Sequence, residues 1–183
     1  MRVVVIGCSG SGKTTFARAL AARLAAGLQD VPHVELDEHF WGPMWRPKPP
    51  EQFRALAAQA AAGERWVIDG NYSAVRSVVW ARATHIVWLD LSLARVMWQV
   101  GRRTWRRATS GQTLWHGNRE SWRKALFSRE SILLWALTTH GRKRREFAAL
   151  RAASKGSADA SGACWIVLRR RSDVAAALDG LVG

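Results

Sequence analysis

Cysteine, long apolar runs and acidic residues are all scarce in this sequence. Cys8 and Cys164 are the two cysteines among 183 residues, too few for a disulfide framework and without the spacing of a zinc site. A protein of the reducing cytosol is therefore expected. The longest apolar run, Ile132 to Leu137, is far too short to span a bilayer. An apolar strand begins next to Met1, so we expect no signal peptide, a cytoplasmic protein and no membrane partner.

The shortage of acidic residues leaves a large positive charge. Lys and Arg number 28 against 14 Asp and Glu, for a formal net charge of +14. The excess is concentrated in residues 101–151, where 13 Lys and Arg against 3 Glu make a net charge of +10. Such a region either binds a polyanion or surrounds a small, highly charged ligand such as a nucleoside triphosphate.

The most informative segment is residues 7–14, Gly-Cys-Ser-Gly-Ser-Gly-Lys-Thr. The short apolar run Val3–Ile6 precedes it, and a helical pattern of apolar residues follows it. Strand, glycine-rich loop and helix are the context in which G-x-x-x-x-G-K-[ST] binds phosphate. The loop amides and the helix N-terminus attract the anion, Lys13 reaches the β- and γ-phosphates, and the hydroxyl of Thr14 ligates Mg²⁺. The residues predicted to contact the nucleotide are Gly7, Ser9, Gly10, Ser11, Gly12, Lys13, Thr14 and Thr15.

Cys8 lies inside this loop, at a helix N-terminus. That environment can lower the pKa of a thiol and make it sensitive to oxidation. The simpler interpretation is a variable position at which cysteine is tolerated.

Short apolar segments alternate with helical patterns along the rest of the chain, and the length fits one domain, residues 1–183. The alternation predicts an α/β fold with a parallel sheet and right-handed crossovers, here a three-layer P-loop NTPase fold with five strands and an Arg-rich helical lid. Strands are expected at Arg2–Ile6, Val34–Leu36, Trp66–Ile68, His85–Leu89 and Trp165–Leu168. Helices are expected at Lys13–Ala26, Pro50–Gly63, Arg119–Thr139 and Gly141–Ala153, and loops at Gly42–Pro50 and Ala108–Asn118.

Three aspartates follow predicted strands: Asp37, Asp69 and Asp90. Ligands of parallel α/β sheets bind at the carboxyl ends of the strands, so all three are expected beside the phosphate loop. We assign Asp69, with Thr14, to Mg²⁺ and keep Asp90 as the alternative; either carboxylate could instead only cap the following turn or helix. Asp37 is assigned to the acceptor, whose hydroxyl it would orient and deprotonate, unless it only caps its loop. Residues 37–63 are the predicted acceptor-binding segment.

The arginines after the fourth strand are predicted to form a lid over the triphosphate, within residues 102–123. Arg103 and Arg107 share one helix face. We favour this pair as catalytic because a positioned arginine can accelerate phosphoryl transfer by about 10³–10⁵-fold. A solvated surface is the simpler explanation for most single arginines, and we expect it for the run Arg142–Arg145. The other lid candidates are Arg102, Arg106, Arg119 and Arg123.

Together these segments resemble the adenylate-kinase-like branch of the P-loop kinases. More closely, the chain is similar to the bacterial family of DNA topology modulation proteins, also called adenylate kinase-related proteins. The similarity covers residues 1 to about 140 and 165 to 181, and it implies a nucleotide-kinase-like fold, binding of ATP with Mg²⁺, and phosphotransfer. It rests on the phosphate loop, Leu36–Trp41, Trp66–Tyr72, Trp88–Leu91 and the Arg-rich helix that follows.

Two departures from the adenylate kinases bear on the acceptor. After the second strand those enzymes carry Thr-Gly, whereas this chain has Asp37–His39. After the third strand they place a phosphate-binding arginine where this chain has Ser73, for which Arg76 or Arg82 could substitute. Both departures argue against AMP as the acceptor. An aspartate after the second strand is more typical of kinases that phosphorylate a hydroxyl group of a small molecule.

The sequence thus predicts an ATP-dependent kinase with a small-molecule or nucleotide acceptor, and with ATP and Mg²⁺ as cofactors. The alternative is a nucleotide-binding regulatory protein associated with DNA or RNA, because tryptophans interleave with the basic residues and can stack on bases. The same tryptophans could instead build the core of the helical layer. A plain NTPase coupled to a partner is a third, weaker interpretation. The tryptophans concerned are Trp98, Trp105, Trp115, Trp122 and Trp135.

Overall fold

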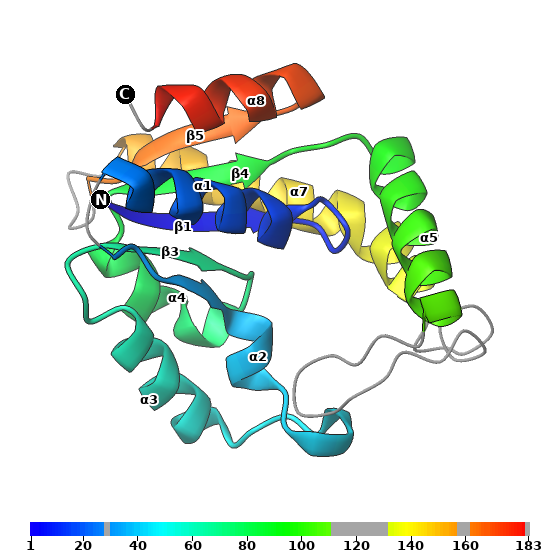
Figure 1. Cartoon of the computed structure of the whole chain (residues 1–183), viewed down its shortest axis with the longest axis horizontal. Helices are drawn as coiled ribbons and strands as arrows, with labels where there is room; N and C mark the ends of the chain where they lie inside the picture. The colour runs from blue at the N-terminus through cyan, green and yellow to red at the C-terminus, as the bar shows by residue number, and fades with distance from the viewer. Residues whose placement is uncertain (28–29, 111–131, 157–161, 182–183) are drawn as a thin grey trace.

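The computed structural model describes residues 1–27, 30–110, 132–156 and 162–181. Across these residues, five parallel strands form one sheet in the order β2-β3-β1-β4-β5 (Figure 1). The strands are β1 (Arg2–Gly7), β2 (His33–Glu35), β3 (Trp66–Asp69), β4 (His85–Leu89) and β5 (Cys164–Leu168). The middle strands β1, β3 and β4 are almost entirely buried, as their unbroken apolar runs predict.

Helices cover both faces of this sheet, so the fold has three layers (Figure 1). The helices are α1 (Lys13–Gly27), α2 (Leu36–Phe40), α3 (Pro50–Ala60), α4 (Ser73–Val79), α5 (Leu93–Ser110), α7 (Ile132–Gly156) and α8 (Arg171–Gly180), with 3₁₀ turns η1 (Pro43–Trp45) and η2 (Trp80–Arg82). Val3 and Val5 of β1 pack with α1 and α8, whereas Val4 and Ile6 pack with α3, α4 and α7. The predicted α/β P-loop NTPase fold with a five-stranded parallel sheet is confirmed.

Two predicted helix boundaries are wrong. α7 continues through Gly141, where we expected a break. A glycine inside a helix costs only about 1 kcal/mol, and the buried side chains of Ala136 and Phe147 anchor α7 on both sides of it. α5 continues to Ser110, into the predicted loop. The rest of that loop and the first part of the helix predicted after it lie outside the described residues.

The segment after β2 is more regular than predicted. Asp37 lies in the first turn of α2, which begins at the buried Leu36, so the strand ends earlier than expected. A carboxylate in the first turn is favourable because the helix N-terminus carries partial positive charge. The predicted loop Gly42–Pro50 contains η1, and a β-bridge joins Pro47 of this loop to Trp41.

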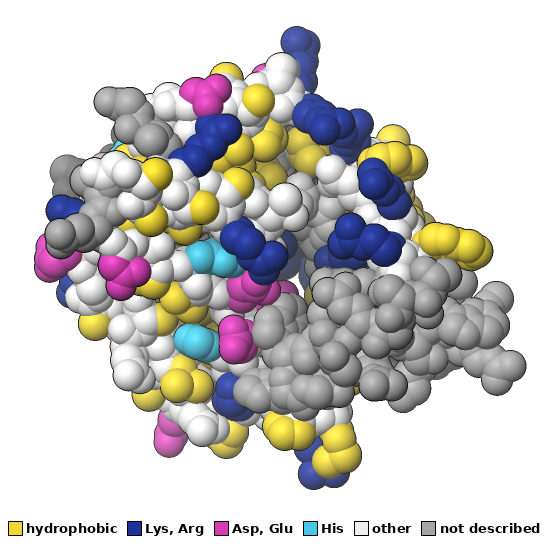
Figure 2. Space-filling model, viewed as in Figure 1, with side chains coloured by type: hydrophobic (Ala, Val, Ile, Leu, Met, Phe, Trp, Pro, Cys, Tyr) yellow, Lys and Arg dark blue, Asp and Glu magenta, His cyan; other side chains and the backbone are white. Residues whose placement is uncertain are grey.

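α5 and α7 lie side by side at one end of the sheet and share a small apolar cluster (Figure 1). The side chains of Trp98, Trp105 and Trp135 are 55%, 75% and 53% exposed, so they do not form the core of this layer. The guanidinium groups of Arg95 and Arg102 each lie 5.5 Å from the ring centre of Trp98. Figure 2 shows Lys and Arg side chains gathered on the side of α5. Within the described residues, no helix has the length and apolar content needed to cross a membrane.

Candidate functional site

The predicted phosphate loop connects β1 to α1 at the carboxyl end of the sheet (Figure 1). Gly10 and Gly12 have φ angles of 79° and 88°, in the left-handed region that glycine enters without strain. The hydrogen bond from Ser11 N to Cys8 O (3.0 Å) closes a tight turn. Lys13 Nζ donates to the same carbonyl oxygen (3.3 Å), so the lysine side chain lies against the loop.

Two features of this loop suit a bound phosphate chain. A Cβ atom at Gly10 would lie 2.0 Å from Val100 Cγ2, so α5 packs against the loop too closely for a side chain. Ser11 Oγ is buried and has no hydrogen-bond partner among the described residues, and a phosphate oxygen is a suitable partner. Ser9 is half-buried and Thr15 is exposed. With the positive end of α1 beside them, these residues fit a nucleotide triphosphate.

Thr14 and Asp69, the pair predicted to hold magnesium, lie together beside the loop. Thr14 Oγ1 donates to Asp69 Oδ1 (3.2 Å), and His33 Nε2 donates to Asp69 Oδ2 (2.8 Å). These bonds satisfy a carboxylate that is only 4% exposed. Hydroxyl and carboxylate oxygens are ligands that Mg²⁺ prefers. In the part of the chain that is described, no cluster of three or more His, Cys, Asp or Glu could hold a metal, so an ion here would also need phosphate oxygens and water.

Asp90, the alternative metal ligand, has other partners. Its carboxylate lies 2.8 Å from Arg144 Nε and 3.4 Å from Arg169 Nε. All three residues line a cavity of about 310 Å³ whose wall also includes Trp88 and Arg151. The Asp90 carboxylate is already paired with two guanidinium groups, whereas the Asp69 carboxylate contacts the hydroxyl of Thr14. The geometry therefore favours Asp69 as the metal-binding acid.

Asp37, the predicted acceptor-side carboxylate, is held by the single tyrosine of the chain. Tyr72 OH donates to Asp37 Oδ1 (2.7 Å). Burial, reinforced by the negative charge of Asp37, raises the pKa of Tyr72, so the phenol remains a proton donor. The Tyr72 ring packs against Phe40 and Phe53, with ring centres 4.6 Å and 5.1 Å away. The Asp37 carboxylate is therefore oriented by a half-buried, tightly packed phenol.

Other residues of the predicted acceptor-binding segment, 37–63, take part in packing. Trp41 contacts Phe40 edge to face, with ring centres 4.8 Å apart. His39 is half-buried, and burial lowers the pKa of its imidazole. Lys48 Nζ donates a hydrogen bond to His39 O (3.1 Å) and so links the end of the loop after α2 back to the helix. Trp41 and His39 thus contribute to the packing of the segment that follows α2.

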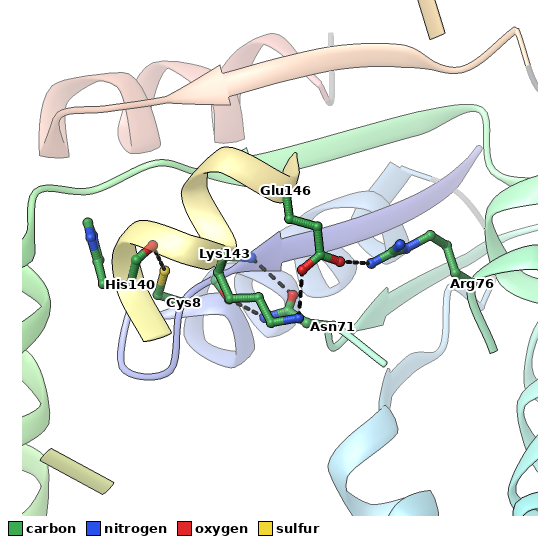
Figure 3. Close-up of polar contacts among 7 residues, drawn as sticks. Cys8, Asn71, Arg76, His140, Lys143 and Glu146 are labelled. Carbon is green, nitrogen blue, oxygen red and sulfur yellow. Dashed lines mark hydrogen bonds and ion pairs between the residues drawn. The ribbon is translucent and has the colours of Figure 1, made fainter. Parts of the chain in front are cut away.

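The backbone of α7 and the side chain of Asn71, in the loop after β3, contact the phosphate loop (Figure 3). Gly7 N donates to Asn71 Oδ1 (3.2 Å), and Asn71 Nδ2 donates to Gly7 O. Cys8 Sγ lies 3.9 Å from the carbonyl oxygen of His140, and His140 Nε2 donates to Leu91 O (3.0 Å). α7 is thus attached both to the phosphate loop and to the segment after β4.

The environment of Cys8 predicts a thiol that reacts slowly with disulfide reagents. Burial raises the pKa of Cys8, although the charge of Lys13 opposes this effect, so the expected lowering by the helix N-terminus does not prevail. Cys164 is exposed. At about pH 8, a disulfide reagent such as DTNB should label Cys164 at least about 100-fold faster than Cys8. The Cys164→Ser variant should retain only the slow reaction, and a fast reaction in that variant would contradict the buried thiol.

The predicted lid is described only in part. Arg103 is half-buried and continues the α5 face formed by Val96 and Val100, the face that packs against the phosphate loop. Position 107 continues the same face, but the side chain of Arg107 lies outside the described residues, as do residues 119–123. Arg103 is thus on the side of α5 that a lid arginine requires, and the role of the pair stays a prediction.

The basic run on α7 is not uniformly solvated. Arg142 and Arg145 are exposed, as predicted, but Lys143 lies 3.0 Å from Glu146 Oε2. Arg144 forms the ion pair with the acid that follows β4. The run therefore contributes side chains to the carboxyl-end rim, which its composition alone did not indicate.

Sequence reasoning gave no role to five residues of this site: His33, Asn71, Tyr72, His140 and Glu146. Asn71 and Tyr72 lie in Trp66–Tyr72, one of the segments that carry the family resemblance, so their neighbourhood was a usable signal. The other three had no motif. Of the two arginines considered as substitutes after β3, Arg76 contacts Glu146 (2.6 Å), whereas Arg82 donates to Ala62 O (2.9 Å), just before β3.

A glycine-rich strand–loop–helix on a five-stranded parallel sheet places the chain in the class of P-loop NTPase folds. No protein-family model matches the chain, and no curated protein matches it. Among solved structures, it is similar to the crystal structure of a gluconokinase from Sinorhizobium meliloti 1021, with 18% sequence identity and a TM-score of 0.48, covering 99% of this chain and 93% of that chain. This likeness is too weak to indicate a substrate, and the similarity to DNA topology modulation proteins stays a prediction.

Proposed function

We propose that the protein is an ATP-dependent kinase that transfers the γ-phosphoryl group of Mg·ATP to a hydroxyl group of a small molecule. The observation that carries this proposal is that Asp37 and Asp69 share one rim. Glu35 is in register with Asp69 on the neighbouring strands β2 and β3, and Asp37 follows two residues later. Phosphoryl transfer to an alcohol requires a donor site and a hydroxyl-orienting carboxylate close together, and here both lie at the carboxyl ends of adjacent strands.

Bound Mg·ATP would supply the phosphoryl group and a metal ion that neutralises its charge. The loop amides would bind the phosphates, and Lys13 would contact the γ-phosphate. Thr14 and Asp69 would hold the ion, with His33 orienting the carboxylate. The loop residues in this role are Gly7, Ser9, Gly10, Ser11, Gly12, Lys13, Thr14 and Thr15.

On the acceptor side, Asp37 would accept a hydrogen bond from the reacting hydroxyl and take its proton as transfer proceeds. Tyr72 would keep the carboxylate in place. Arg103 and Arg107 would stabilise the negative charge of the transferring group as parts of a lid formed by residues 102–123. Residues 37–63 would surround the acceptor.

A phosphotransfer screen tests the proposal directly. Purified protein with Mg·ATP would be offered nucleoside monophosphates, nucleosides, polyols, sugars and hydroxy acids. We expect transfer to one acceptor class, and a loss of about 10²–10⁴-fold in Lys13→Ala because the phosphate contact is removed. ATP binding without transfer to any acceptor would contradict the kinase. ATP turnover in the absence of an acceptor would indicate an NTPase.

A second candidate function is nucleic-acid binding coupled to nucleotide binding. The exposed Trp98 and Trp105, with Arg95 and Arg102 over the Trp98 ring, favour it, since such surfaces stack on bases and contact phosphates. Binding of this kind weakens steeply with salt. It becomes the preferred function if the screen finds ATP binding without an acceptor.

A further inference from the structure

A carboxylate lies between two cations from different helices, close to the phosphate loop (Figure 3). Arg76 Nη2, from α4, is 2.6 Å from Glu146 Oε1, and Lys143 Nζ, from α7, is 3.0 Å from Glu146 Oε2. The three side chains are 21%, 23% and 32% exposed for Arg76, Lys143 and Glu146, so they are shielded but remain accessible. Burial opposes ionisation of Glu146, but hydrogen bonds from Arg76 and Lys143 outweigh it and lower the pKa. Glu146 is therefore an anion at neutral pH.

This cluster adjoins both halves of the proposed active site. Figure 3 shows the cluster together with Asn71, whose amide is hydrogen-bonded to Gly7, the last residue of β1. On α7, Lys143 follows His140 by about one helical turn, and the carbonyl oxygen of His140 lies 3.9 Å from Cys8 Sγ in the phosphate loop. Arg76 belongs to α4, which begins directly after Tyr72, the partner of the acceptor-side carboxylate.

We propose that Arg76 and Lys143 bind an anionic group of the acceptor and that Glu146 holds this site until the acceptor arrives. The proposal rests on the kinase function above and narrows its substrate to alcohols that also carry a carboxylate or a phosphate. A guanidinium presents five N–H donors and an ammonium three, and both cations are regular ligands of these two anions. A neutral alcohol carries no negative charge that could replace the Glu146 carboxylate as the partner of Arg76 and Lys143.

A purely structural link between α4 and α7 accounts for the cluster less well. One cation suffices to neutralise one carboxylate, whereas here two cations face Glu146 and leave a net positive charge. Bringing an anion to this charge is favourable in a partly shielded site. The two explanations differ in the effect of replacing Glu146 with a neutral residue. If the cluster is a structural link, the attachment of α4 to α7 would weaken. If it is an anion site, Arg76 and Lys143 would become more available to an added anion.

Titration with inorganic phosphate separates them without any enzyme activity. In a Lys13→Ala background, which weakens the phosphate loop, we expect Glu146→Gln to tighten phosphate binding by about tenfold, because a competing anion is removed. Arg76→Met and, independently, Lys143→Met should each weaken it by about tenfold or more. Arg145→Met, an exposed cation on the same helix, is the matched control and should leave the affinity unchanged. Urea midpoints would verify that each variant folds. Phosphate affinity that is indifferent to Glu146→Gln, Arg76→Met and Lys143→Met would overturn the proposal.

A matched set of acceptors tests the substrate class in the unmodified protein. Glycerol, glycerate and glycerol 3-phosphate share three carbons and differ in charge. We expect the two anions, and not glycerol, to be phosphorylated or to compete with the acceptor found in the screen, and their ranking distinguishes carboxylate from phosphate. Glycerol acting as well as the anions would overturn the anion site while leaving the kinase intact. If phosphate binding depends on Arg76 but no acceptor is phosphorylated, the anion site would be supported and the kinase function would be contradicted.

Discussion

Replacing Gly10 with alanine is expected to lower the free energy of unfolding by about 3 kcal/mol and to abolish ATP binding. The new Cβ would lie 2.0 Å from Val100 Cγ2, and overpacking of this kind costs about 1–3 kcal/mol. The φ angle of 79° would add strain of about 1–2 kcal/mol for a residue with a side chain. Relief requires the phosphate loop to move away from α5, which displaces the amides that would bind phosphate. Urea denaturation and nucleotide titration would measure the two effects.

Two other glycines serve as controls because each isolates one contribution. Gly12 has a φ angle of 88°, and a Cβ atom added there would meet no other atom within 4 Å, so alanine should cost only the backbone strain, about 1–2 kcal/mol. Gly101 lies inside α5 with open space around it, and alanine there should raise stability by about 0.5–1 kcal/mol. Equal losses at Gly10 and Gly12 would contradict the tight contact between the loop and α5.

The second large effect is expected from Asp37→Asn, which should reduce kcat by about 10²–10⁴-fold. The amide keeps the shape of the side chain and can still accept the hydrogen bond from Tyr72, but it cannot take a proton from the acceptor hydroxyl. Because the donor site is unchanged, KM for ATP should stay within about twofold. Steady-state kinetics with the acceptor identified by the screen would measure both constants.

Glu51→Gln is the control for this substitution. Glu51 is an exposed carboxylate in the first turn of α3, within the same predicted acceptor segment, so any general effect of lost charge should appear there too. We expect kcat to be unchanged in that variant. An Asp37→Asn protein with full kcat would show that the carboxylate only caps its turn, the simpler role considered from the sequence.

The parts of the site that could be predicted from the sequence are those with local signals. The phosphate loop lies within eight consecutive residues, 7–14, whose glycines, lysine and threonine each have one physical role. Asp37 and Asp69 could be placed at one rim because parallel strands carry their carboxyl ends to the same edge. The strand boundaries followed from unbroken apolar runs, and they were correct to within one or two residues.

The remaining contacts depend on residues that are distant in the chain. His33 and Asp69 are 36 positions apart, Arg76 and Glu146 are 70 apart, and Cys8 and His140 are 132 apart. No spacing rule joins such residues, because only the packed fold brings them together.

The choice between Asp69 and Asp90 as the metal-binding acid also depended on residues that are distant in the chain. Both aspartates follow buried strands, and only the positions of Arg144 and Arg169 distinguish them. The continuity of α7 through Gly141 likewise depended on buried contacts on either side of the glycine, which local propensity does not contain.

The order of the strands also bears on how the chain is synthesised. β2 precedes β3 in the sequence, yet β3 lies between β1 and β2, so β1 and β2, the first two strands of this sheet in chain order, are not neighbours in the fold. In the sheet, Val3 of β1 is paired with Val67 of β3 on one side and with His85 of β4 on the other. Neither partner is available until the ribosome has synthesised it. Closing such long loops is slow and has an entropic cost. The most apolar strand therefore leaves the ribosome before either of its neighbours in the sheet, and it stays unpaired until β3 and β4 have been synthesised.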